Sequence, residues 1–322
     1  MMARLKWWDA LARFLFAPDA DRWLGLLRFG LGLQVSLYCV SLRRDWNALF
    51  TGEGNLFISR DLTEAILKIE NPFGPQIGWF VTLGNQFGLN EQTTLSILWR
   101  LLLCAGGCLL VGFFSRSAAV IAWLLHLCAA KSGDYLAYGV DNLTTIGLFY
   151  LAIAPLPDRY ALDSKLWRTP GIDPARLGFH RRLLQLHLCV IYFFSGLTKC
   201  LGAGWWNGSS IWRALSRPPF NIVPVELLAS WKIVFPFLGI AVCVIETGYP
   251  FLIWPQKTRL VWLIAILTMH IGIGLTMGLH LFSLIMAVLN VAAFGPGSWT
   301  MFRQSFDSVE ALRLQPRPSG TA

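Results

Sequence analysis

Long apolar runs separated by short polar segments dominate the chain. A helix needs about 20 mostly apolar residues to cross a bilayer. The runs are continuous, whereas the strands of a membrane barrel alternate over about ten residues. The sequence therefore predicts an all-α integral membrane protein, a polytopic bundle of about eight transmembrane helices, at 23–42, 94–114, 118–130, 142–156, 183–199, 233–254, 260–276 and 281–294.

Three parts follow from this pattern. Residues 1–21 place basic side chains among tryptophan, leucine and phenylalanine, which predicts an amphipathic helix on the cytoplasmic membrane surface rather than a cleavable signal peptide. Residues 22–294 form the transmembrane domain, interrupted by a polar segment at 43–92 and by a segment rich in Gly, Trp and Pro at 200–232. Residues 295–322 are expected to be a polar tail.

Composition supports a membrane protein. The chain of 322 residues is 55% hydrophobic and only 14% charged, whereas soluble domains carry about 25% charged residues. Tryptophan and phenylalanine are abundant, and aromatic residues favour the membrane–water interface. The seven cysteines lie mostly inside apolar runs without zinc-ligand spacing, so we interpret them as packing residues and expect no metal site.

The net charge of +9 predicts orientation rather than nucleic-acid binding, because the basic residues gather in particular loops. With eight spans, most of them fall on one side, which we assign as cytoplasmic together with both termini. The segment 43–92 is net acidic and is expected outside, whereas the segment 200–232 disagrees because it is basic. The cytoplasmic set is Arg116, Arg159, Lys165, Arg168, Arg176, Arg181, Arg182, Lys257, Arg259, Arg303, Arg313 and Arg317.

Ionisable residues inside apolar runs are functional candidates, because an unpaired charge in a bilayer costs several kcal/mol. These candidates are Arg28, Arg100, His126, Lys131, Asp141, His187, Lys199, Glu246, His270 and His280. His126 and His187 have no distinguishing context, and we interpret them as packing histidines.

Lys199 is the most informative of these residues. It ends the run Tyr192-Phe-Phe-Ser-Gly-Leu-Thr-Lys199, and helical spacing puts Tyr192, Ser195 and Lys199 on one face. Two interpretations are open. The lysine could extend to the interface, or it could lie partly desolvated at a polar cavity, where a neutral amine serves as a base.

His270 and Glu246 lie within the later spans. His270 is either a histidine hydrogen-bonded between helices or a member of the site, near a Gly274-x-x-x-Gly278 seam that permits close helix contact. We expect Glu246 to pair with a buried cation, Arg28 or Arg100.

Asp141 and Asn142 open the fourth span. Asp141 could simply cap that helix, or its carboxylate could face the pocket where Lys199 ends. The segment that follows Lys199 contains Trp205 and Trp206 between glycines. It could form a turn that lines a cavity, or the tryptophans could anchor the chain at the interface.

The run from Tyr192 to Lys199, followed by Trp205 and Gly208, resembles the motif of the vitamin K-dependent gamma-carboxylases. Their bacterial relatives are the horizontally transferred transmembrane (HTTM) domain proteins. Weaker matches are Asp141-Asn142 with Gly147, and His270 followed by Leu281-Phe-Ser. The resemblance extends from about residue 22 to residue 294.

This resemblance implies a membrane enzyme of carboxylase or lyase type, or another quinol-dependent modifying enzyme. Lys199 would be the base that deprotonates a reduced quinone of the vitamin K or menaquinone type, with His270 in the catalytic site. Asp141, Asn142, Tyr192, Ser195, Trp205 and Trp206 would line the quinol pocket, which opens to the non-cytoplasmic side. A multi-pass protein of the bacterial inner membrane is expected.

The sequence also departs from that family. Asp141-Asn142 stands where the carboxylases have an Asn–His pair, and the large lumenal domain that recruits their protein substrates has no counterpart. Some bacterial relatives, of the sporulation-delaying protein B type, serve in the maturation of secreted peptide toxins. The alternatives are therefore a non-catalytic partner for maturation of, or immunity to, an exported peptide, and a transporter.

Overall fold

A computed structural model describes residues 2–52, 58–133, 135–167 and 171–297, with the side chains of residues 2–6 left out. These residues form helices and connecting turns, and no strand occurs among them. Most of the expected tail, with Arg303, Arg313 and Arg317, lies outside the described residues, as does Arg168.

The eight expected spans are all helices. Five segments are long and apolar enough to cross a membrane, namely α2 (Arg22–Ser41), α6 (Glu91–Val111), α10 (Pro174–Cys200), Lys232–Leu252, which contains α14 (Phe235–Leu252), and α15 (Gln256–Met277). The other three expected spans correspond to α7 (Ser115–Ser132), α8 (Gly139–Ile153) and α16 (His280–Phe294), which do not meet that criterion.

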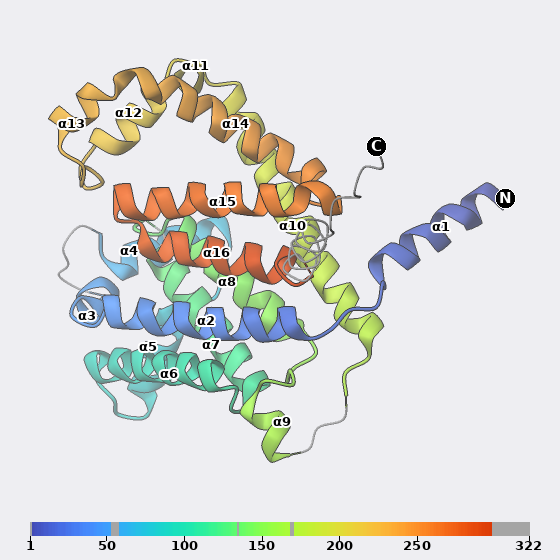
Figure 1. Ribbon diagram of the computed structural model, residues 1–322. Helices are drawn as coiled ribbons and strands as arrows, with labels where there is room; N and C mark the ends of the chain where they lie inside the picture. The colour runs from blue at the N-terminus through green and yellow to red at the C-terminus, as the bar shows by residue number, and fades with distance from the viewer. Residues whose placement is uncertain (1, 53–57, 134, 168–170, 298–322) are drawn as a thin grey trace, which may run out of the picture.

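Shorter helices lie at the two ends of this bundle. In Figure 1, α1 (Met2–Leu15) lies at the right of the view and α9 (Leu162–Leu166) at the bottom, whereas α3 (Trp46–Phe50) and α4 (Arg60–Glu70) lie at the left. The remaining short elements are α5 (Ile77–Gln86), α11 (Ala203–Trp206), α12 (Ser209–Ser216), α13 (Val225–Ser230) and the 3-10 turn η1 (Lys232–Val234).

The expected start of the fifth span at residue 183 is wrong, because α10 begins at Pro174. The Asp173 side chain accepts a hydrogen bond from the Ala175 amide, and proline is favoured in the first turn of a helix. Arg181 and Arg182 therefore lie on a helix rather than in a basic loop. The Arg181 side chain is directed into the bundle, where its guanidinium binds the Asp19 carboxylate at 2.6 Å.

Helix α2 forms the centre of the bundle. Its buried face packs against α6, α8 and α16. A Cβ on Gly32 would lie 2.6 Å from the Leu110 backbone nitrogen, and one on Gly106 would lie 2.8 Å from the Ser36 hydroxyl. Two glycines that face each other across the seam thus let α2 and α6 approach closely.

Arg28 fastens this central helix to the end of the bundle nearest α1. Its guanidinium donates to the Asp158 carboxylate at 2.6 Å and to the carbonyls of Leu109 and Leu110 at 2.6 and 3.2 Å. Those carbonyls belong to the last turn of α6, where a cation is favoured by the helix dipole. Arg28 is therefore satisfied locally, and the expectation that it pairs with Glu246 is wrong.

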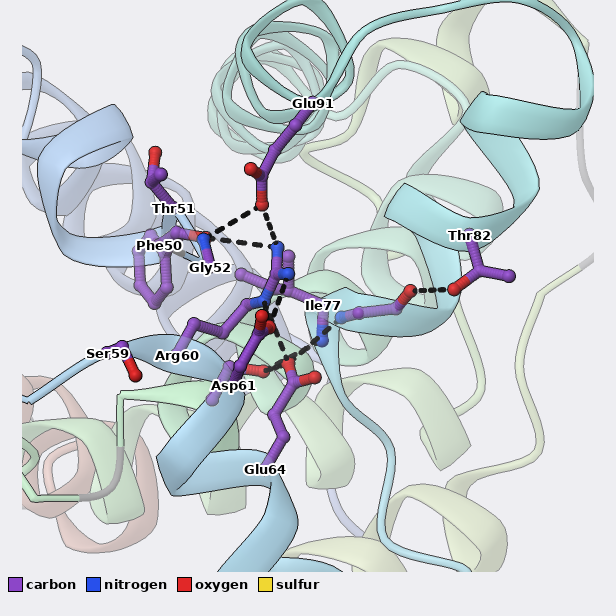
Figure 2. Close-up of polar contacts among 12 residues, drawn as sticks. Phe50, Thr51, Gly52, Ser59, Arg60, Asp61, Glu64, Ile77, Thr82 and Glu91 are labelled. Atoms are coloured by element: carbon purple, nitrogen blue, oxygen red, sulfur yellow. Dashed lines mark hydrogen bonds and ion pairs between the residues drawn. The ribbon is translucent and has the colours of Figure 1, made fainter. Parts of the chain in front are cut away.

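At the opposite end, Arg60 holds the polar segment 43–92 together (Figure 2). Its guanidinium contacts the carboxylates of Glu91 at 2.6 Å, Asp61 at 2.7 Å and Glu64 at 3.8 Å, and donates to the Phe50 carbonyl. Burial lowers the pKa of Arg60, but the hydrogen bond with Asp61 and the surrounding carboxylates outweigh it, and the net pKa is raised. This cluster joins α3, α4 and α6.

Glu64 extends the same cluster to α5 and α7. Its Oε1 accepts hydrogen bonds from the Ser132 hydroxyl at 2.6 Å and from the Gly78 amide at 2.9 Å. The Ser132 oxygen in turn accepts from the Ile77 amide. Because a Cβ on Gly78 would collide with Glu64, this contact requires glycine. The described parts of the segment 43–92 are thus bonded to α6 and α7.

We predict that Arg28→Ala destabilises the protein by about 3–5 kcal/mol, because Asp158 is then a buried, unpaired charge. Reversible unfolding in bicelles measures this change. Arg43→Ala is the matched control, since Arg43 is exposed just beyond α2. Equal stability of the two variants would contradict the role of Arg28.

Candidate functional site

The site expected around Lys199 lies along the seam between α10 and α14, two helices that run antiparallel. The rings of Tyr192 and Tyr249 lie 4.2 Å apart across this seam. One turn further along α10, a Cβ on Gly196 would lie 2.6 Å from the Thr247 backbone nitrogen. Glycine is therefore needed at position 196, and it brings the next turn of α10 close to α14.

That next turn carries Lys199. Its Nζ donates to the Ser195 hydroxyl and to Glu246 Oε2, both at 2.6 Å. The lysine side chain is 21% exposed and the glutamate side chain 7% exposed. Such short contacts are those of charge-assisted hydrogen bonds. The amine is thus held by the protein rather than extended to the interface, and it keeps one partly exposed side.

Glu246 pairs with a cation as expected, but that cation is neither Arg28 nor Arg100. Arg28 binds Asp158, and Arg100 is exposed on α6. Glu246 binds Lys199 instead, because Gly196 lets the two helices approach until both side chains reach each other.

Trp205 completes the surroundings of Lys199. The lysine Nζ lies 5.4 Å from the centre of the Trp205 ring, within the range of a cation–π contact. Short helix α11 positions this ring by packing its backbone against Gly239 of α14, where a Cβ would collide with the Trp205 carbonyl. Gly208, at a φ of +79°, then turns the chain into α12.

The two tryptophans of this segment have different positions. Trp205 is half-buried beside Lys199, whereas Trp206 is 49% exposed and donates through Nε1 to the Cys200 carbonyl at 2.7 Å. Trp205 belongs to the site, and Trp206 faces outward.

A buried chain of hydrogen bonds includes Tyr192, about two turns before Lys199 on α10. Tyr249 donates to Asn290 Oδ1 at 2.7 Å, and Asn290 Nδ2 donates to the Tyr192 hydroxyl oxygen at 2.7 Å. The Tyr192 hydroxyl lies 2.9 Å from His270 Nε2. Because the Tyr192 oxygen accepts from Asn290, its own proton is free to be donated to His270.

The direction of the contact between Tyr192 and His270 depends on the His270 tautomer. When Nε2 accepts from Tyr192, the ring proton lies on Nδ1. His270 is 3% exposed, and Nδ1 has no hydrogen-bond partner among the described residues, a status that it shares with Nε2 of His126. The His270 ring is also within electrostatic range of the Lys199 ammonium.

Asn290 and Tyr249 were not among the sequence candidates. Asn290 is a fully buried amide within the largely apolar helix α16. A polar side chain in an apolar run is a functional candidate, and on this ground the sequence could have identified Asn290. Tyr249 gave no comparable signal, because a tyrosine in an apolar run is ordinary.

Asp141 lies in a different place. It accepts a hydrogen bond from the Tyr138 amide at 3.0 Å and caps α8. It also lines a cavity of about 180 Å³ with Tyr38, Leu42 and Phe50, between α2, α7 and α8. Lys199 does not line this cavity, and capping of α8 is the expectation for Asp141 that the structure bears out.

Asn142 also lies away from Lys199. It is exposed on the first turn of α8, and this helix packs against α2, α7 and α16 rather than along the seam of α10 and α14.

His126, which is buried, and His187, which is half-buried, each contact a neighbouring helix. His126 contacts the Thr145 hydroxyl and His187 the Tyr150 hydroxyl, each at 2.9 Å. Among the residues that the structure describes, no group of three or more His, Cys, Asp or Glu is placed to hold a metal ion.

Comparisons of the chain with protein families, with curated proteins and with solved structures return no match. The resemblance to the carboxylases therefore stays a prediction, and the geometry of the Lys199 site carries the argument.

We predict that Tyr192→Phe costs about 1–3 kcal/mol of unfolding free energy, because His270 and Asn290 each lose a buried partner. Thermal unfolding in detergent or bicelles would measure the loss. Tyr135→Phe is the control, since that tyrosine is 51% exposed. A Tyr192→Phe protein as stable as the control would show that the hydrogen-bond chain contributes nothing.

Proposed function

We propose that this chain is a multi-pass protein of the bacterial inner membrane with eight spans and with both termini in the cytoplasm. The support is the basic end of the bundle around α1 and α9. There Arg116, Arg159, Arg181 and Arg259 are bonded to nearby carbonyls or carboxylates. Clustered arginines favour the cytoplasmic side, so Lys199, near the opposite end of α10, faces the non-cytoplasmic side.

We further propose that it is an enzyme of the vitamin K-dependent gamma-carboxylase-like HTTM family, in which Lys199 and Glu246 form the proton-transfer couple. The single observation that carries this proposal is the 2.6 Å contact between Lys199 Nζ and Glu246 Oε2, with one-fifth of the lysine side chain left accessible. A couple of this kind holds a proton next to an open side, as general acid–base catalysis requires.

The proton moves along this contact. Desolvation disfavours a pair of separated charges relative to a neutral amine and a neutral carboxylic acid. When a ligand excludes water from the site, the proton therefore passes from Nζ to Glu246 Oε2. Ser195 holds the nitrogen in place through its 2.6 Å contact. Once the new Glu246 hydroxyl turns away from Nζ, the lone pair of the neutral amine can accept a proton from an acidic hydroxyl.

A reduced quinone fits these residues by its chemistry. When bound, it supplies an acidic phenolic hydroxyl and two reducing electrons. Trp205 offers an aromatic face beside Nζ, and Nδ1 of His270 is a buried polar atom without a partner among the described residues. Tyr192 fixes His270 through Nε2. Asp141, Asn142 and Trp206 are not part of this set.

The substrate that fits this orientation is a secreted peptide. Helix α11 packs against α10 and α14 beside Lys199, and α12 packs against α14, at the end that we place on the non-cytoplasmic side, where an exported chain would arrive.

We predict that Lys199→Ala lowers quinol-dependent activity by at least about 100-fold, because the base is lost. The assay is oxidation of reduced menaquinone by the protein in liposomes, with oxygen and carbon dioxide supplied. The activity of Glu246→Gln should fall to a similar extent, because the glutamine amide cannot take the proton. Lys232→Ala is the control, since Lys232 is exposed on the same side of the bundle.

Full activity of a folded Lys199→Ala protein would overturn the catalytic proposal. If that variant instead still matured an exported peptide without quinol turnover, the protein would be a non-catalytic partner. Solute uptake by the same liposomes would favour a transporter.

A further inference from the structure

Two free cysteines continue the seam between α10 and α14 beyond Lys199. Cys200 is the last residue of α10, and Cys243 lies on α14 one turn before Glu246. Neither residue takes part in the proton-transfer couple proposed above.

The register of the two helices places these cysteines opposite each other. Along the antiparallel seam, Tyr192 of α10 faces Tyr249 of α14, and Gly196 faces Thr247. Four residues after Gly196 on α10 comes Cys200, and four residues before Thr247 on α14 comes Cys243, so these two residues lie on the facing sides of the two helices. The two thiols are close enough to interact with each other.

The two thiols differ in accessibility. Cys243 is 1% exposed, whereas Cys200 is half-buried at the end of its helix, beside the exposed Trp206. An external reagent can therefore reach Cys200 first. Cys243, on the buried side, is then placed to attack the Cys200 sulfur. Thiol–disulfide exchange needs this pairing of an attacking thiol and a resolving thiol.

We propose that Cys200 and Cys243 form a reversible dithiol–disulfide couple that exchanges with thiol–disulfide compounds on the non-cytoplasmic side. The Cys200 thiolate attacks an external disulfide, which releases one thiol and leaves a mixed disulfide. The Cys243 thiolate then attacks Cys200 Sγ and releases the second thiol. Each cysteine gives up one proton and one electron, and the external disulfide gains two electrons and two protons.

The dithiol–disulfide couple would affect the Lys199 site directly. The disulfide would join α10 to α14 covalently within one turn of both Lys199 and Glu246. The oxidised protein would keep the seam closed, while the reduced protein would hold it through side-chain contacts alone. Membrane proteins meet oxidising conditions on the non-cytoplasmic side, where disulfides persist.

The test uses the full chain in lipid nanodiscs, equilibrated with mixtures of reduced and oxidised glutathione and then quenched with N-ethylmaleimide. Peptide mass spectrometry should show both thiols lost together, with one cross-linked peptide pair containing Cys200 and Cys243. Cys104→Ser is the control and should behave like the wild type, because Cys104 is an exposed thiol on α6.

The single variants separate the two roles. Cys243→Ser should leave Cys200 as a mixed disulfide with glutathione, and Cys200→Ser should leave Cys243 reduced. The proposal is overturned if both wild-type thiols stay alkylated in the most oxidising mixture, or if wild-type Cys200 accumulates as the mixed disulfide. The assay involves no quinol, so either result leaves the proposed function untouched.

Discussion

The pairing of Lys199 with Glu246 is the interaction on which the site depends. A lysine and a glutamate inside a helical bundle are costly apart, because each would be a charge without a partner in an apolar medium. Together they satisfy each other at 2.6 Å, with Ser195 completing the contact. The pair is possible only because Gly196 removes the side chain that would separate α10 from α14. The same close approach aligns Tyr192 with Tyr249 and Cys200 with Cys243.

The polar groups of the bundle fall into separate clusters with separate tasks. Arg28 and Arg60 are bound by carboxylates at opposite ends, and both contact the backbone of neighbouring elements. These two clusters hold the helices of the bundle in place. Around Lys199 and His270 the hydrogen bonding is incomplete, since Nδ1 of His270 lacks a partner among the described residues and Lys199 keeps an accessible side. Unsatisfied capacity of this kind is typical of a site that receives a ligand.

The sequence was sufficient for properties that depend on local pattern. Apolar length located the helices, and the spacing of Ser195 and Lys199 predicted their contact. The start of α10 was missed because its arginine-rich first turns resemble a loop. The partner of Glu246 could not be predicted, because the register between α10 and α14 depends on a close approach at Gly196. Asp141 lines a cavity that Lys199 does not line, and hydropathy could not predict this because it gives depth in the membrane, not lateral position in the bundle.

A double-mutant cycle on Lys199 and Glu246, with unfolding free energy measured in bicelles, tests the central claim most directly. The variants are Lys199→Met, Glu246→Gln and the combination of both. If the two side chains form a desolvated ion pair, each single change leaves one buried group without its partner, and the double variant should be less destabilised than the sum of the single variants by about 1–3 kcal/mol. Strictly additive losses would mean that the two residues do not interact, which would contradict the account.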